Sequence, residues 1–208
     1  MTVNVSHFVL LHFIVAANMN SYESARQPRR EYQTMSQSFS THVCREALSN
    51  GLTNAFFNGV IAWYLVKHRD LIPVWGAEGL AVDFTATSII LVFIVSLIVI
   101  PLARRKVRKG DFPFVDWPAG ALRNFLGFMA QRHLAVCALM LGLLSALLFV
   151  PPMLLLTQVL EISTFSAQHF AVVKGIWAGI VAAAMVVAML SIVTVAKQDA
   201  EPSTETKY

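Results

Sequence analysis

Three asparagines stand at four-residue intervals inside an otherwise apolar run: Asn50, Asn54 and Asn58. On an α-helix, positions four apart differ by only about 40° around the axis, so the three amides form one stripe, which Thr53 widens. An amide in hydrocarbon that lacks a hydrogen-bond partner costs several kcal/mol. We therefore expect the stripe to face protein or water and not lipid.

A second group of polar side chains begins at Asp83, which stands directly before an apolar run that starts at Phe84. An aspartate in that position is a favoured helix N-cap, because its carboxylate accepts hydrogen bonds from the unpaired N–H groups of the first turn. The sequence predicts that Asp83 caps a helix starting at Phe84. The alternative is that Asp83 belongs to a polar site.

The run after Asp83 carries hydroxyl side chains at helical spacing. A short loop joins it to the asparagine run, so the two helices must be antiparallel, and their depths can be matched at about 1.5 Å per residue. This matching puts Asn54 level with Ser96 and predicts a contact between them. The candidate polar site or interhelical contact comprises Asn50, Asn54, Asn58, Asp83, Thr85, Ser88 and Ser96.

The chain lacks the strong catalytic motifs: it has no P-loop, no dinucleotide-binding glycine pattern, no HExxH, no CxxC and no GxSxG. Its six histidines are scattered, and none is paired at metal-ligand spacing. We therefore expect no metal, no cofactor and no catalytic residue. An enzyme would require four outward groups to converge at the membrane surface, namely His68, Asp83, Glu161 and His169.

The composition identifies the solvent of these residues as lipid. The 208 residues are 56% hydrophobic and 13% charged, with a mean hydropathy of +0.61. A membrane-spanning helix needs about 20 apolar residues. Four runs contain no Asp, Glu, Lys or Arg: 47–66, 84–103, 133–160 and 175–196. The sequence predicts an all-α integral membrane protein, a bundle of four transmembrane helices over residues 47–196.

The basic residues fix the expected orientation. Lys and Arg number 4 in residues 1–46, 2 in 67–83, 7 in 104–132, 1 in 161–174 and 2 in the tail, so one side of the membrane would carry 13 and the other 3. Basic residues accumulate on the cytoplasmic side. We expect a multi-pass protein of the plasma (inner) membrane with both termini in the cytoplasm.

Five basic residues directly follow the second run. At the membrane surface they are expected to attract anionic lipid headgroups, at about 1 kcal/mol each. No aromatic side chains are interleaved with them, which argues against nucleic acid. This candidate lipid contact comprises Arg104, Arg105, Lys106, Arg108 and Lys109.

Residues 118–132 carry the start signals and the apolar stripe of an amphipathic helix. Asp116 is placed to cap it and Pro118 lies in its first turn. The sequence is compatible both with a separate helix in the cytoplasmic interface and with an N-terminal extension of the third span. The stripe consists of Leu122, Phe125, Leu126 and Met129.

Small residues recur at four-residue spacing in the third and fourth runs, where they would let helix backbones approach closely. Matching depths across the loop between these runs predicts a tight interface between the third and fourth helices. The candidate packing residues are Gly142, Ala146, Gly175, Gly179 and Ala183.

The ends of the chain read as disordered cytoplasmic segments, 1–46 and 197–208. A start of translation at Met35 would leave residues 1–34 outside the native protein. Cys44 and Cys137 are expected to stay reduced, because the cytosol does not favour disulfides.

Three function hypotheses follow. In the first, which the sequence favours, the polar face of the first two helices makes the chain a small permease-like protein. In the second, the amides join helices in a structural or assembly factor of a membrane complex. In the third, the outward groups form an enzyme, which requires a convergence that the spacing does not show. The expected partners are the bilayer and either further copies of the chain or another membrane subunit.

Overall fold

The structure is a computed structural model that describes residues 39–111 and 117–200, all within the unit Gln37–Tyr208. The predictions for residues 1–38, the cap at Asp116 and most of the tail lie outside the described residues. Residues 39–46 and 197–200 were expected to be disordered, but they are helical. The first helix therefore begins before the apolar run that predicted it.

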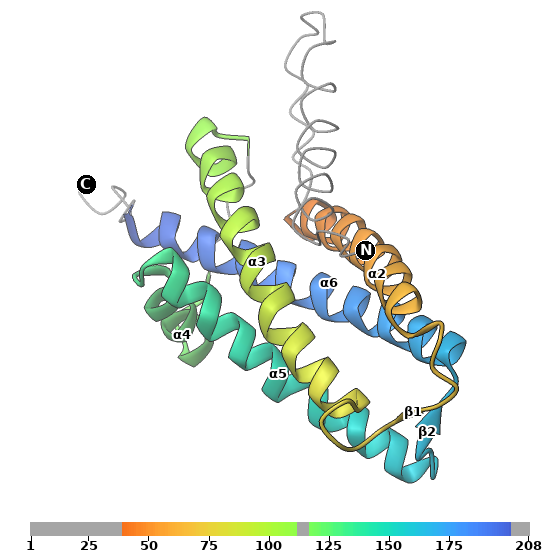
Figure 1. Cartoon of the computed structure of the whole chain (residues 1–208). Coiled ribbons are helices and arrows are strands. Elements are labelled where there is room, and N and C mark those ends of the chain that lie inside the picture. Colours follow the sequence, from red (N-terminus) through yellow and green to blue (C-terminus); the bar gives the residue numbers. More distant parts are fainter. Residues whose placement is uncertain (1–38, 112–116, 201–208) are drawn as a thin grey trace, which may run out of the picture. The chain divides into compact units, whose positions relative to one another are not determined.

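The described residues form five helices and two very short strands (Figure 1). Three of the helices are long and apolar enough to cross a membrane, over Leu80–Lys109, Leu134–Val159 and Ala167–Asp199. The helix with the asparagines is not among them, because three amides lower its hydropathy. The elements are α2 (Phe39–Val66), β1 (Ile72–Pro73), α3 (Leu80–Lys109), α4 (Ala121–Ala130), α5 (Leu134–Val159), β2 (Thr164–Phe165) and α6 (Ala167–Ala200).

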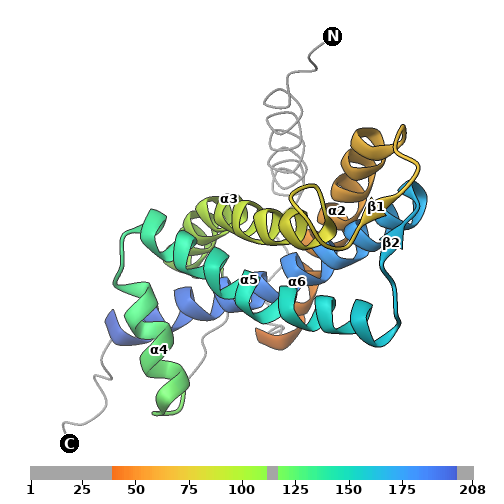
Figure 2. The ribbon, with the colours of Figure 1, turned by 60° about the horizontal axis from the view of Figure 1, so that its bottom comes forward.

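The two strands join the loop after α2 to the loop after α5. They pair antiparallel, with Ile72 opposite Phe165 and Pro73 opposite Thr164. Both loops therefore lie at one end of the helices, which we call the strand end (Figure 2). The opposite end, where α3 finishes in its run of basic residues, is called the basic end. It follows that α2 and α5 run towards the strand end, whereas α3 and α6 run away from it.

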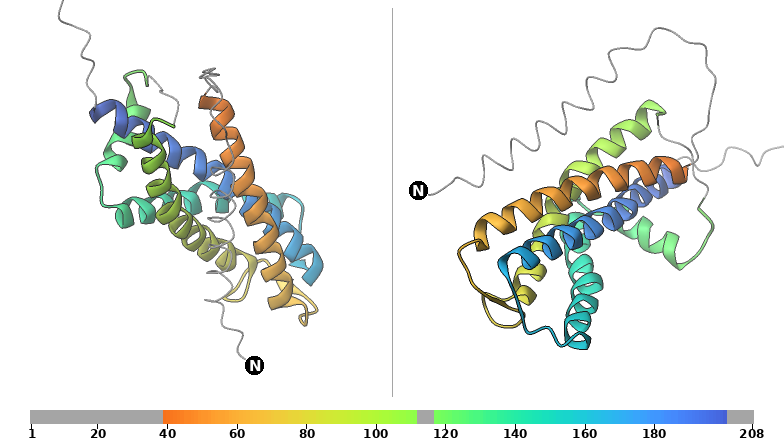
Figure 3. Two further views of the ribbon diagram at one scale, coloured as in Figure 1. Left: turned by 90° about the horizontal axis from the view of Figure 1, so that it is seen from above. Right: turned by 90° about the vertical axis from the view of Figure 1, so that its right-hand side faces the viewer.

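Helix α6 is the element on which α2, α3 and α4 pack. α2 lies antiparallel along α6, as the right-hand view of Figure 3 shows, and α3 and α4 also contact α6. Glycines make the α2–α6 approach close: a Cβ on Gly175 would lie 2.8 Å from the carbonyl oxygen of Ala55, and one on Gly51 would lie 3.1 Å from the Cβ of Ala183. On Gly179 it would lie 2.8 Å from Gly51 O.

The expected interface between the third and fourth spans is therefore wrong. The small residues of α6 face α2, and α5 packs mainly on α3, where a Cβ on Gly142 would lie 2.8 Å from the carbonyl oxygen of Ile89. Ala146 is half-buried against the core. The rise per residue gives the depth of a residue but does not identify the helix that faces it.

The start of α3 differs from the prediction, and the break between α4 and α5 decides between the two alternatives for residues 118–132. α3 begins at Leu80 with Gly79 at its N-cap position, so Asp83 lies inside the first turn and does not cap the helix. α4 ends at Ala130 and α5 begins at Leu134, so residues 121–130 form a separate helix and not an extension of the third span. The described part of α4 buries Leu126 and Met129 and exposes Leu122 and Phe125.

Candidate functional site: a polar ladder on α2

Five polar residues at successive intervals of four form one stripe along α2, which we call the polar ladder: His42, Glu46, Asn50, Asn54 and Asn58. Each asparagine donates a hydrogen bond from Nδ2 to the carbonyl oxygen one turn earlier. The distances are 3.0 Å from Asn50 to Glu46, 2.8 Å from Asn54 to Asn50 and 3.0 Å from Asn58 to Asn54. The three amides are therefore held against their own helix.

This arrangement uses only part of what each amide can offer. An asparagine side chain carries two N–H donors and one accepting oxygen. The three Oδ1 atoms have no hydrogen-bond partner among the described residues, and the side chains are only half-buried. From His42 to Asn58 the ladder is about 24 Å long at 1.5 Å per residue. The three amides with free oxygens, Asn50 to Asn58, occupy about 12 Å of this length.

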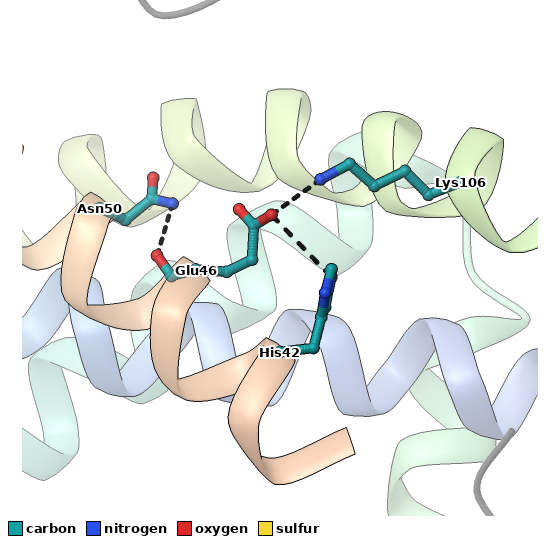
Figure 4. A network of polar contacts seen from close by, with 4 residues as sticks. All are labelled: His42, Glu46, Asn50 and Lys106. Carbon is teal, nitrogen blue, oxygen red and sulfur yellow. Dashed lines mark hydrogen bonds and ion pairs between the residues drawn. The ribbon is translucent and has the colours of Figure 1, made fainter. Parts of the chain in front are cut away.

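At the basic end the ladder becomes ionic (Figure 4). The Nζ of Lys106 lies 2.7 Å from Oε1 of Glu46 and donates a hydrogen bond to it. Nε2 of His42 lies 3.9 Å from the same oxygen. The contact between Lys106 and Glu46 joins α2 to α3 across 60 positions of sequence.

His42 precedes the apolar run that starts at Ala47. Its side chain is buried, and this burial is the main cause that lowers the pKa of the imidazole below its ordinary 6.5. The carboxylate of Glu46 opposes the shift, whereas the positive charges of Lys106 and Arg45 add to it. The imidazole is therefore neutral at neutral pH.

The sequence pointed to the three asparagines but not to the two residues that extend the stripe. The signal was present, because His42 and Glu46 continue the same four-residue spacing. They were missed because they lie before the apolar run. Lys106 was predicted to bind lipid, but it pairs with Glu46.

The expected contact between Asn54 and Ser96 is absent from the described residues. Ser96 is fully buried and donates to the carbonyl oxygen of Val92 at 2.6 Å. The carbonyl oxygen of Ser88 accepts a hydrogen bond from Ser145 of α5 at 3.2 Å. The two buried serines of α3 therefore belong to the face that packs on α5 and α6, and they do not join the ladder. The exposed Thr85 donates to the carbonyl oxygen of Ala81 at 2.8 Å.

Asp83 forms a second polar contact, at the strand end. Nζ of Lys174 lies 2.7 Å from each carboxylate oxygen of Asp83. The Lys174 side chain is 7% exposed and that of Asp83 is 36% exposed. Next to the pair, Phe84 stacks on Trp177 with ring centroids 4.4 Å apart. Lys174 was expected in a loop, but α6 begins at Ala167 and places it on the helix.

The outward groups of the enzyme hypothesis do not converge. Asp83 pairs with Lys174, and Nδ1 of His169 lies 2.9 Å from the hydroxyl of Ser166. In the part of the chain that the structure describes, no acid–imidazole pair forms at the strand end. No group of three His, Cys, Asp or Glu side chains there could hold a metal ion.

The basic cluster divides into two sets. Lys106 pairs with Glu46, and a guanidinium nitrogen of Arg104 lies 3.4 Å from the carbonyl oxygen of Ala130. These two side chains therefore hold α3 against its neighbours. Arg105, Arg108 and Lys109 are exposed. This second set is the more exposed of the two.

Two surface hollows in the described part of the chain lie away from the ladder. One lies between α4 and the end of α6 and is lined by Arg123, Phe128 and Asp199, among others. The other lies on the outer face of α3, around Val82 and Ile89. Neither is lined by an asparagine of the ladder.

Comparison of the chain with protein-family models, with curated proteins and with solved structures finds no match. The function must therefore be inferred from the geometry of the polar ladder, of the Asp83–Lys174 pair and of the exposed basic residues. The ladder is the only one of the three that runs through the expected depth of the membrane.

Proposed function

We propose that α2 is a fourth membrane span and that the described helices form a four-span bundle. Its 28 residues extend about 42 Å, enough to cross a bilayer. It packs antiparallel along α6, which is a candidate span. Glu46 near its start meets Lys106 near the end of α3, and the strand end follows its last residue. These depths support a crossing by α2.

The same proposal includes the orientation. The basic end faces the cytoplasm of a plasma (inner) membrane, because it carries Arg105, Arg108 and Lys109 in exposed positions. Both chain termini are then cytoplasmic. α4, with Leu122 and Phe125 exposed, lies in the cytoplasmic interface.

In this frame the protein acts as a structural or assembly subunit of a membrane complex, and the polar ladder is its contact with another chain. The observation that carries the proposal is that three half-buried amides keep their accepting oxygens unused within the described residues. Lipid offers those oxygens no donor, so a bilayer-facing ladder costs free energy until a polar helix covers it.

The strength of such a contact is modest, and its specificity is high. Hydrogen bonds between helices in a membrane average about 0.6 kcal/mol. Three amides spaced by one turn accept only a partner helix whose donors have the same spacing. The ladder is therefore better suited to selecting a partner and its register than to supplying most of the binding energy.

A permease-like function is the second candidate, and one observation favours it. The ladder leads without interruption from the ionic contact of Glu46 and Lys106 to Asn58, deep in the expected span. In an assembled complex this row of amides would line a polar path for a small uncharged solute. No observation favours an enzyme, and we propose a non-enzymatic role.

The test replaces Asn54 and Asn58 together with leucine. Purification in mild detergent is expected to give a folded protein of normal abundance that elutes partly as a smaller species and retains less of its co-purifying chain. The matched control, Leu52→Ala together with Phe56→Ala, changes two exposed positions of the same helix. An unchanged complex in the asparagine variant would contradict the assembly proposal.

A vesicle-swelling assay tests the permease-like function. Proteoliposomes are mixed with glycerol or urea, and swelling is followed by light scattering. The permease proposal expects faster swelling with wild-type protein and a loss of that increase in the leucine variant. If wild-type vesicles swell no faster than empty ones, permeation of these solutes is excluded.

A further inference from the structure

We propose that the partner of the polar ladder is a second copy of this chain, joined through a two-fold axis along the membrane normal. This inference rests on the proposed function, namely that the ladder contacts another chain. It adds the identity of that chain and the register of the contact. Asn50, Asn54 and Asn58 would each face the same residue of the other copy.

All copies of the chain insert into the membrane in the same orientation. The asymmetry of basic residues, with Arg105, Arg108 and Lys109 exposed at one end, orients every copy in the same way. Two copies that meet through α2 therefore lie parallel. In a parallel two-fold contact, residues at equal depth face each other.

The amide groups of two identical ladders can form hydrogen bonds with each other. After donating one N–H to its own helix, each asparagine keeps one N–H donor and its Oδ1 acceptor. Two such groups face to face can donate to and accept from each other. An identical helix has the required donors at the required four-residue spacing by construction, whereas an unrelated partner would need to match all three positions. Buried asparagines fix register and oligomeric state in this way in coiled coils.

The charged residues at the basic end do not oppose this contact. Closing two identical ladders also brings their ionic ends together, and bare carboxylates would repel. Glu46 is paired with Lys106 of its own chain at 2.7 Å, and His42 is buried. The contact therefore brings no unpaired like charges together.

The sides of α2 indicate which residues flank the contact. The α6-facing side carries Gly51 and Ala55. Asn54 is half-buried and lies at the centre of the proposed contact. Leu52 is 64% exposed and lies about 160° around the axis from Asn54, so it faces away from the ladder. These two neighbours, at nearly the same depth, separate a ladder contact from any other contact of α2.

Crosslinking in native membranes tests the geometry. Both natural cysteines are replaced by alanine, and either Asn54→Cys or the control Leu52→Cys is introduced. Copper phenanthroline accepts the two electrons released when two thiols join as a disulfide. We expect a covalent dimer from Asn54→Cys, because Asn54 faces its own copy in the proposed contact, and little from Leu52→Cys. A control that crosslinks as well as or better than Asn54→Cys overturns the proposed contact.

Stoichiometry tests the partner. Singly labelled wild-type protein in supported bilayers should bleach in two steps, and replacing Asn54 and Asn58 with leucine should weaken dimerisation roughly eightfold. Asn54→Gln, which keeps the amide, should retain more of the dimer than Asn54→Leu. These readouts do not depend on knowing a solute or an activity.

The failures of the two proposals are distinguishable. A wild-type protein that bleaches in one step, while the leucine variant loses a different co-purifying chain, overturns the second-copy inference and leaves the assembly function standing. One-step bleaching with no chain lost overturns both. Two-step bleaching that the leucine variant leaves unchanged places the dimer contact elsewhere and overturns the inference.

Discussion

Lys174 of α6 lies with its Nζ 2.7 Å from both carboxylate oxygens of Asp83, joining two helices whose pairing partners are 91 positions apart. The lysine is almost fully buried, so its charge depends on this carboxylate for compensation. A buried ammonium that loses its partner costs more than an exposed one, because protein and lipid solvate it poorly. The pair therefore fixes α3 against α6 at the strand end.

Asp83→Asn is expected to destabilise the protein by about 2–3 kcal/mol. This is less than the roughly 3–5 kcal/mol of a fully buried pair, because Asp83 is partly exposed. Thermal unfolding in detergent measures the effect. The control is Glu78→Gln, which breaks the exposed pair with Arg69 at 2.9 Å and should cost under about 1 kcal/mol. Equal losses in the two variants would show that Lys174 is not held by Asp83.

The close approach of α2 and α6 depends on glycine. A Cβ on Gly175 would lie 2.8 Å from Ala55 O, so Gly175→Ala must push the helices apart and should cost roughly 1–3 kcal/mol. Gly120→Ala is the control, because a Cβ there meets no atom within 4 Å. Thermal stability by fluorescence-detected gel filtration compares them. A variant at Gly175 as stable as the control would contradict the observed packing.

Much of the fold could be predicted from composition and periodicity, because length and hydropathy alone identify helices that can cross a membrane. The three candidate spans follow from the apolar runs. Which helix contacts which could not be predicted. Gly175 and Gly142 were recognised as packing residues, yet the partners are Ala55 of α2 and Ile89 of α3. Spacing within one helix contains no information on the direction of its neighbour.

In the candidate site, too, features within one helix could be predicted and contacts between helices could not. The asparagine stripe could be read from the sequence, because its spacing lies within one helix. The pairing of Lys106 with Glu46, and of Lys174 with Asp83, could not, because each joins different helices. Asp83 also looked like a cap only because the helix was expected to begin at Phe84, one turn later than it does.

Stability should depend on pH through His42. Its pKa is lowered in the folded protein, mainly by burial, so the unfolded chain binds the proton more readily. The resulting stability is present above the unfolded pKa and is lost as pH falls through the lower folded value. We expect the melting temperature of the wild-type protein to decrease between about pH 7 and about pH 5. The melting temperature of the His42→Gln variant should decrease less over the same range.

The control for this pH dependence is His68→Gln, because His68 is exposed on the loop after α2. It should keep the wild-type slope. Glu46 and Lys106 stay in place in both variants, so the difference between them isolates the imidazole. If His42→Gln and wild type lose stability in parallel over this range, burial of His42 is not the cause.

We expect the exposed basic residues at the end of α3 to bind more anionic lipid than the two that bond to other helices. Arg105, Arg108 and Lys109 are exposed, so replacing all three with glutamine should release anionic lipid, at about 1 kcal/mol per residue. Native mass spectrometry of protein with phosphatidylglycerol counts the bound lipids. Arg104 and Lys106 bond to Ala130 and Glu46, so their replacement should lower the melting temperature with less loss of lipid. Equal lipid loss from both sets would mean that the internal bonds do not withhold Arg104 and Lys106 from the membrane surface.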